Sequence, residues 1–111
     1  MIELLSGATS SGPGAAVSFP ERAGYYTVWF ETSSDFSPST SFGHTDVGVQ
    51  IATSTAGPWV NAPAGGVAFS STGSTASFSN FTLGVYVAMR GYLTHAPETG
   101  SVSLKLFTDR V

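Results

Sequence analysis

Apolar and polar residues alternate with a period of two over much of this chain. Asp46–Thr53 and Ser101–Thr108 are the clearest cases, each with apolar residues separated by small or polar ones. This alternation predicts β-strands, because successive side chains of a strand point to opposite faces. No segment repeats apolar residues at helical spacing. The expected strands are Ile2–Leu5, Ala15–Phe19, Tyr25–Glu31, Asp46–Thr53, Trp59–Asn61, Val67–Ser70, Ala76–Thr82, Val85–Leu93 and Ser101–Thr108.

The segment Tyr25–Glu31 differs from the others because both of its faces are apolar. It is rich in aromatic and β-branched residues and contains no Gly or Pro, which is the composition of a strand. We expect it to be a central strand of its sheet. One face would carry Tyr26, Val28 and Phe30, and the other Tyr25, Thr27 and Trp29.

Many short strands separated by turn signals, without helices, predict an all-β fold. We expect a two-sheet antiparallel β-sandwich of the jelly-roll or immunoglobulin-like (Ig-like) type, with a barrel as the alternative. The length of 111 residues suits one domain, so residues 1–111 should form a single sandwich. Ser6–Gly14 is built of small and polar residues, and we therefore expect residues 1–14 to be a flexible N-terminal arm.

The inward positions of these strands define a candidate core. It comprises Val28, Phe30, Val49, Ile51, Val87, Leu104 and Leu106. Most aromatic residues on the strands also suit the core better than a ligand-binding platform, since large apolar side chains are usually buried. These aromatic residues are Tyr26, Phe30, Trp59, Phe78 and Phe81.

Two further aromatic residues fall in a polar loop. Thr32–Thr45 is rich in Ser, Thr, Asp, Pro and Gly, but it contains Phe36 and Phe42. Ordering such a loop costs conformational entropy, so its aromatic rings need an apolar environment. Either they cover one end of the sandwich, or they bind a neighbouring subunit. Phe36 and Phe42 are therefore the candidate interface residues.

Charge is scarce, and its distribution argues against two classes of partner. Charged residues make up 10% of the chain, and the net charge is -3. The basic residues are Arg22, Arg90, Lys105 and Arg110. They are too few and too scattered to follow a phosphate backbone, so we expect no nucleic-acid binding. No apolar run approaches the roughly 20 residues that span a bilayer, and residues 1–6 do not resemble a signal peptide, so we expect no membrane association.

Few residues of this chain could carry chemistry. It contains no cysteine and two histidines, which excludes thiolate metal sites and cysteine nucleophiles. His44 and Asp46 share a face of an extended chain, but an enzyme would also need an activated nucleophile. His95 has only Glu98 near it in the sequence, and a zinc site needs three or four ligands. We therefore expect no catalytic residues, no cofactor, no metal site and no enzymatic activity.

Three segments of the second half resemble a pattern found in small virion proteins of tailed bacteriophages. Val47–Ser54 leads through Gly57 to Trp59, which is similar to a V-x-V-Q-x-S hairpin followed by Trp. Tyr86–Thr94 is similar to a Y-V-x-x-R-x-x-x-T strand, and Glu98–Leu106 to a T-G-S-V-S-V-x-L last strand. Together with the residues between them, these segments cover about half of the chain.

The resemblance implies a non-enzymatic virion structural protein, with a capsid decoration (cement) protein as the first choice. Such a protein would stabilise the phage head through contacts with the major capsid protein or another virion protein. We expect a homo-oligomer, with a trimer favoured, located in the virion after assembly in the host cytoplasm. A tail or neck accessory protein is the alternative of the same class. A carbohydrate-binding module is the alternative of another class, with Tyr25, Thr27 and Trp29 on one strand face as its sugar-binding platform.

Overall fold

The structure, a computed structural model, describes residues 2–18, 26–62, 68–81 and 86–108. Within these ranges the chain forms strands and connecting loops without a helix, and no helix that could cross a membrane is found there. The strands are β1 (Ile2–Ala8), β2 (Gly12–Pro13), β3 (Val17–Ser18), β4 (Tyr26–Thr32), β5 (Thr45–Ala52), β6 (Val60–Asn61), β7 (Ala68–Ser71), β8 (Ala76–Phe81), β9 (Ala88–Leu93) and β10 (Val102–Thr108).

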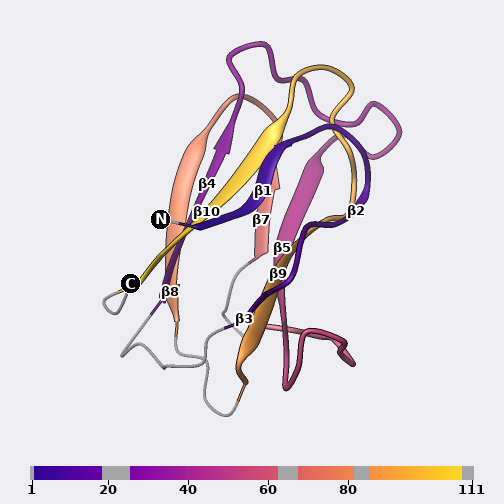
Figure 1. The fold of residues 1–111 in the computed structure, drawn as a ribbon. Coiled ribbons are helices and arrows are strands. Elements are labelled where there is room, and N and C mark those ends of the chain that lie inside the picture. The colour runs from indigo at the N-terminus through magenta and orange to yellow at the C-terminus, as the bar shows by residue number, and fades with distance from the viewer. Residues whose placement is uncertain (1, 19–25, 63–67, 82–85, 109–111) are drawn as a thin grey trace.

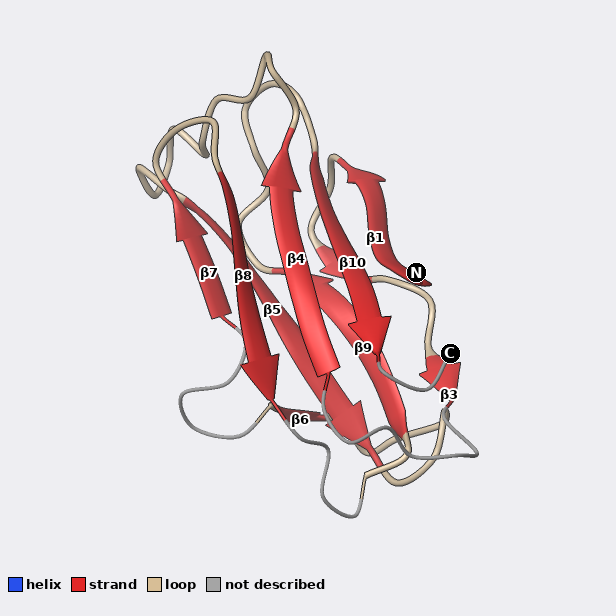
Figure 2. Ribbon diagram, turned by 90° about the vertical axis from the view of Figure 1, so that its left-hand side faces the viewer, coloured by secondary structure: helices blue, strands red, loops and turns tan. Residues whose placement is uncertain are grey.

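The strands form two sheets that pack face to face (Figures 1 and 2). The four-stranded sheet has the order β1-β10-β4-β8. The six-stranded sheet has the order β2-β9-β5-β6, with β3 also paired to β9 and β7 also paired to β5. All these pairs are antiparallel. The two separate sheets confirm the predicted antiparallel β-sandwich. The alternative prediction of a closed barrel is wrong.

The pairing follows the order of the chain in a regular way. β2 and β3 both pair with β9, and β6 and β7 both pair with β5, in each case at different residues. Each couple therefore occupies one strand position. The first strand then pairs with the last, the second position with β9, β4 with β8, and β5 with the β6/β7 position. An antiparallel hairpin rolled into two sheets in this way is a jelly roll, the first of the two expected sandwich types.

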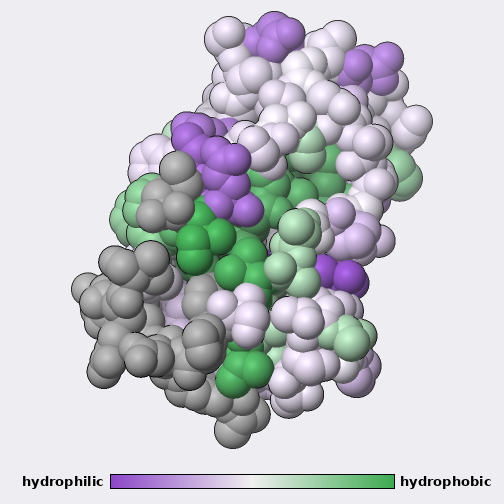
Figure 3. Space-filling model, viewed as in Figure 1, coloured by the Kyte–Doolittle hydropathy of each residue, from purple (hydrophilic) through white to green (hydrophobic). Residues whose placement is uncertain are grey.

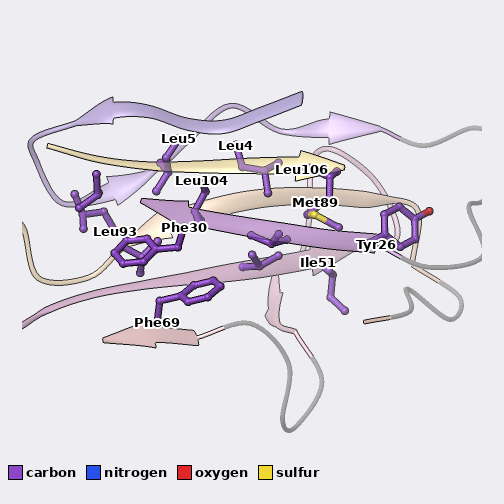
Figure 4. Packing of buried hydrophobic residues seen from close by; sticks show 14 of the residues in the cluster. Leu4, Leu5, Tyr26, Phe30, Ile51, Phe69, Met89, Leu93, Leu104 and Leu106 are labelled. Atoms are coloured by element: carbon purple, nitrogen blue, oxygen red, sulfur yellow. The ribbon is translucent and has the colours of Figure 1, made fainter. Parts of the chain in front are cut away.

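The hydrophobic core lies between the two sheets, as Figure 4 shows for its larger side chains. The predicted core residues that are buried are Val28, Phe30, Val49, Ile51, Leu104 and Leu106. The prediction for Val87 is wrong, because this side chain is only half-buried. β9 begins one residue later, at Ala88. The N–H of Val87 donates to the carbonyl of Ala52 at 3.1 Å. The alternation of a strand does not extend back to Val87.

The placement of Phe78 in the core is also wrong, since its side chain is 60% exposed. The register of β4 and β8 pairs Phe78 with Trp29. Trp29 points away from the core because its two neighbours in β4 point into it. Phe78 therefore lies on the outer face. The other aromatic residues expected in the core are Tyr26 and Phe30, which are buried, Trp59, which is half-buried, and Phe81, whose side chain lies outside the described residues.

Residues 1–14 were expected to form a flexible arm, whereas the structure pairs strands of this segment with both sheets. β1 pairs with β10 and β2 pairs with β9, so the N-terminal segment supplies an edge to each sheet. Register shifts on both sides of Leu5 allow Leu4 and Leu5 to be buried together. Burial of two leucines and pairing with β10 favour order here.

Two glycines mark the place where β1 approaches the six-stranded sheet. The N–H of Gly14 donates to the carbonyl of Gly91 at 2.8 Å. A Cβ atom on Gly14 would lie 2.0 Å from the carbonyl oxygen of Leu4, and one on Gly91 would lie 2.9 Å from Cγ of Leu5. Glycine is therefore required at both positions by the close approach of the backbone.

The predicted hairpin after β5 is confirmed. Gln50 pairs with Asn61 and Ile51 with Val60, so the Ser54–Pro58 turn returns the chain along β5. Gly57 has a φ of 86°, a left-handed conformation that glycine adopts without steric cost. On one face of the molecule, Figure 3 shows mostly residues of intermediate hydropathy, with hydrophobic residues gathered across the middle.

Candidate functional site

The two histidines of the chain lie against a single carboxylate. Nδ1 of His44 is 2.8 Å from Oδ1 of Asp46. Nδ1 of His95 is 3.2 Å from Oδ2 of the same residue. We call His44, Asp46 and His95 the His–Asp–His cluster. It brings together the pair predicted from its spacing and a third residue that the sequence placed elsewhere.

The cluster is assembled by the register of β5 and β9. These strands are antiparallel and pair Val47 with Leu93, so the residues that follow Leu93 run past Asp46. The N–H of Thr94 donates to the carbonyl of Asp46 at 2.9 Å, and His95 is the next residue. Asp46 itself points outward because Val47 points into the core.

The expectation that His95 has only Glu98 as a neighbour is therefore wrong. Oε2 of Glu98 accepts a hydrogen bond from the Thr40 hydroxyl at 3.2 Å instead. His95 and Asp46 are 49 positions apart, and their contact depends on strand register. The sequence could have indicated this contact if the predicted strands Asp46–Thr53 and Val85–Leu93 had been paired antiparallel, because the start of the first then lies beside the end of the second.

The environment of Asp46 favours its charged form. Burial raises the pKa of this carboxyl, but hydrogen bonds with Ser70 and His44 and the charges of the two imidazoles outweigh burial and lower the pKa below its ordinary value. Ser70 lies opposite Asp46 in the pairing of β5 with β7. Asp46 is thus flanked by Ser70 of β7 and by the two histidines, which lie in loops.

Phe42 and Phe36, the two candidate interface residues, lie in different environments. Phe36 is 8% exposed and belongs to the hydrophobic core cluster, so it covers one end of the sandwich. Phe42 is 58% exposed, and its ring stacks on the imidazole of His95 with the centroids 3.8 Å apart. Of the two, Phe42 alone presents a largely free ring at the surface of the chain.

The chemistry of the cluster is that of a ligand set rather than a catalytic triad. A donor atom from each of the three residues lies within 4.8 Å of the others. Within the described ranges, the hydrogen bonds of both imidazoles go to Asp46 and not to a hydroxyl group. An activated nucleophile requires its hydroxyl on the imidazole instead. The arrangement could hold a metal ion, and it does not activate Ser70.

Arg90 also lies on the outer face of the six-stranded sheet, where it contacts polar and aromatic side chains. Nε of Arg90 donates to Oε1 of Gln50 at 2.8 Å. Its guanidinium lies 4.5 Å from the ring centroid of Trp59 and 6.0 Å from that of Tyr92. These contacts fix the direction of the Arg90 side chain on this face.

The outer face of the four-stranded sheet carries aromatic side chains. Trp29 and Phe78 stack with ring centroids 6.4 Å apart and planes 5° apart. Phe107 lies on the same side of the sheet, opposite Thr27, and is 44% exposed. We call Trp29, Phe78 and Phe107 the aromatic face. Of the predicted carbohydrate platform, Trp29 belongs to this face, Thr27 is half-buried and bonded to Asn80, and Tyr25 lies outside the described residues.

An ion pair fixes the polar border of the aromatic face. Nζ of Lys105 lies 2.6 Å from Oε1 of Glu31, and the indole N–H of Trp29 donates to Oε2 of Glu31 at 3.2 Å. The hydrogen bonds from Lys105 and Trp29 lower the pKa of Glu31, and the same contact with Glu31 raises the pKa of Lys105. The ion pair leaves no net charge beside Trp29, and the indole is hydrogen-bonded to its carboxylate.

Comparison of the chain with protein-family models, with curated protein sequences and with solved structures finds no significant match.

Proposed function

We propose that this chain is a non-enzymatic structural protein of a tailed-bacteriophage particle. In this proposal it is a capsid decoration protein that attaches to the head through its aromatic face. The observation that carries the proposal is the exposure of Phe78 and Phe107, 60% and 44%, on one side of one sheet. Exposed apolar groups that gather on one face mark interaction surfaces.

The aromatic face has the properties of a protein-binding surface. Trp29 is held in place by its stacking on Phe78 and by its hydrogen bond to Glu31. A side chain that is already ordered loses less entropy when it binds. Tryptophan and other large aromatic residues dominate the affinity of many protein interfaces. The paired charges of Glu31 and Lys105 add no net charge that would repel a neutral partner surface.

The assignment of the partner rests on the phage resemblance of Asp46–Leu106. It points to the major capsid protein or another virion protein, and to a homo-oligomer, a trimer in the favoured form. Low charge density supports this, because a chain with 10% charged residues has few surface charges to keep neighbouring subunits apart. Jelly rolls occur in viral capsid domains and also in lectins, so the fold alone does not decide between them.

The test uses heads and tails purified from the phage whose genome encodes this chain. We expect the purified protein to co-sediment with heads and to decorate them in cryo-electron micrographs. Phe78→Ser and Phe107→Ser should each weaken head binding at least tenfold while leaving the circular dichroism spectrum unchanged. Val60→Ser is the matched control, because Val60 is also 44% exposed but lies on β6 of the other sheet.

Other outcomes would replace this proposal. Binding to tails alone would indicate a tail or neck accessory protein. Binding to neither particle, together with binding to an oligosaccharide array that is lost in Phe78→Ser, would indicate a carbohydrate-binding module. Solution mass from light scattering distinguishes a trimer from a monomer in each case.

A further inference from the structure

We propose that the His–Asp–His cluster is a binding site for a divalent transition-metal ion of the zinc class. The proposal is independent of the phage assignment, because it concerns the opposite sheet and different residues. It rests on the convergence of both histidines of the chain on Asp46, with a donor atom of each residue within 4.8 Å of the others.

The donor atoms suit this class of ion. Imidazole nitrogen is a preferred ligand of Zn²⁺, Cu²⁺ and Ni²⁺, and carboxylate oxygen completes many of their sites. Ca²⁺ and Mg²⁺ prefer six or more oxygen ligands, and the cluster offers two nitrogens. The Nδ1 atoms of His44 and His95 lie 2.8 Å and 3.2 Å from the carboxylate oxygens of Asp46. Two ligand atoms of a tetrahedral zinc ion are separated by a distance only a few tenths of an ångström longer.

The three ligands come from segments that the fold already fixes. Asp46 is in β5 and directly follows the loop that holds His44, and His95 is in the loop after β9. These two loops lie at the same end of the sandwich (Figures 1 and 2). The two loops are joined by an antiparallel bridge, in which the N–H of Ser37 donates to the carbonyl of Thr99 at 3.0 Å. Metal binding would therefore require little ordering of the chain.

The residues around the cluster resemble the supporting shell of a metal site. Ser70 lies opposite Asp46 in the pairing of β5 with β7, and the ring of Phe42 stacks on His95. Such contacts orient ligands and are part of most metal sites. The side chains of His44, Asp46 and His95 remain 37%, 32% and 22% exposed. An ion can thus enter from solvent, and water can fill its remaining coordination positions.

The first experiment is isothermal titration of the full chain with Zn²⁺ at neutral pH. We expect binding of one ion per chain. His44→Ala, His95→Ala and Asp46→Asn should each weaken the affinity at least tenfold. Glu98→Gln and Glu3→Gln are the matched controls, because Glu98 lies in the same loop as His95 but bonds Thr40, and Glu3 pairs with Lys105 on the other sheet. Both controls should bind like the wild-type chain.

Two further measurements keep the proposal open to refutation even if a variant misfolds. Co²⁺ added to the wild-type chain should give the visible absorption of a site with nitrogen ligands, and excess Ca²⁺ should not displace it. Nuclear magnetic resonance of the two imidazoles should show that both respond to the first equivalent of Zn²⁺. A chain that binds no Zn²⁺, or that binds it with either imidazole unaffected, would show that the cluster is a hydrogen-bonded surface feature only.

Discussion

The ring of Phe42 lies almost parallel to the imidazole of His95, with the centroids 3.8 Å apart and the planes 20° apart. This contact joins the loop between β4 and β5 to the loop between β9 and β10. It also separates the roles of the two loop phenylalanines, because Phe36 is buried in the core cluster and Phe42 packs on the surface. The loop is therefore anchored at one aromatic residue and exposed at the other.

The different burial of the two loop phenylalanines predicts different effects on stability. Phe36→Ala should lower the free energy of unfolding by about 3 kcal/mol, as truncation of a buried phenylalanine does. Phe42→Ala should lower it by less than about 1 kcal/mol, since its ring is largely exposed. Urea unfolding followed by fluorescence measures both. Equal effects would mean that Phe36 does not cover the end of the sandwich.

Phe30 tests the centre of the core. Its side chain is 1% exposed and stacks on Phe69 with the centroids 5.1 Å apart. Phe30→Ala should cost about 3–5 kcal/mol of unfolding free energy. Val87→Ala provides the comparison, because Val87 is only half-buried and should cost about 1 kcal/mol or less. A loss below about 1 kcal/mol for Phe30→Ala would contradict the inward direction of that side chain.

The close approach of the backbone at Gly14 predicts that a single methyl group is harmful there. A Cβ at this position would overlap the carbonyl oxygen of Leu4, so Gly14→Ala should destabilise the fold by at least about 1–3 kcal/mol. Gly73→Ala is the matched control, since nothing lies within 4 Å of its Cβ position, and it should change stability by less than about 0.5 kcal/mol. Thermal unfolding of the two variants side by side gives the answer.

Glu31 predicts a pH dependence that can be followed at one carboxyl. Its pKa in the folded chain is lowered below the ordinary value of 4.5 by hydrogen bonds from Lys105 and Trp29. A lowered folded pKa means that the ion pair stabilises the fold above about pH 4.5, and that this contribution is lost as the pH falls through the folded value. The effect on stability should be small, because both side chains are partly exposed.

Carboxyl carbon resonances measured against pH give this pKa directly. Lys105→Met should move the pKa of Glu31 back toward its ordinary value, and Trp29→Phe should do so to a lesser extent, following the order of the two causes. An unchanged pKa in Lys105→Met would show that the ion pair does not form in solution.

Strands and turns could be predicted where the determining interactions are local. The alternation in Asp46–Thr53 and Ser101–Thr108 was sufficient for β5 and β10, because a strand needs only that successive side chains face opposite sides. The turn at Ser54–Pro58 was also local, since Gly57 takes the left-handed conformation that few other residues adopt easily. These predictions needed no knowledge of which segments pair.

Alternation does not show which of two faces is buried when both carry apolar residues. On β8 the alternation places Phe78 on the face opposite Ser77 and Ser79, but it does not show which face is buried. The pairing of Phe78 with Trp29 places Phe78 on the outer face of the sheet. The same limit applies to the N-terminal segment. Its small polar residues suggested an arm, and only the partners offered by β10 and β9 order them as β1 and β2.

The residues in order were enough to predict the all-β class, most of the core and the proximity of His44 to Asp46, with a sandwich favoured over a barrel. The tertiary structure alone decided the jelly-roll order, the exposure of Phe78 and the arrival of His95 at Asp46. The physical reason is the range of the interactions: side-chain direction within a strand depends on its own backbone, whereas strand register depends on how two distant segments bury their apolar faces together. Val47 pairs with Leu93 because both are core residues, and that pairing carries His95 to the carboxylate.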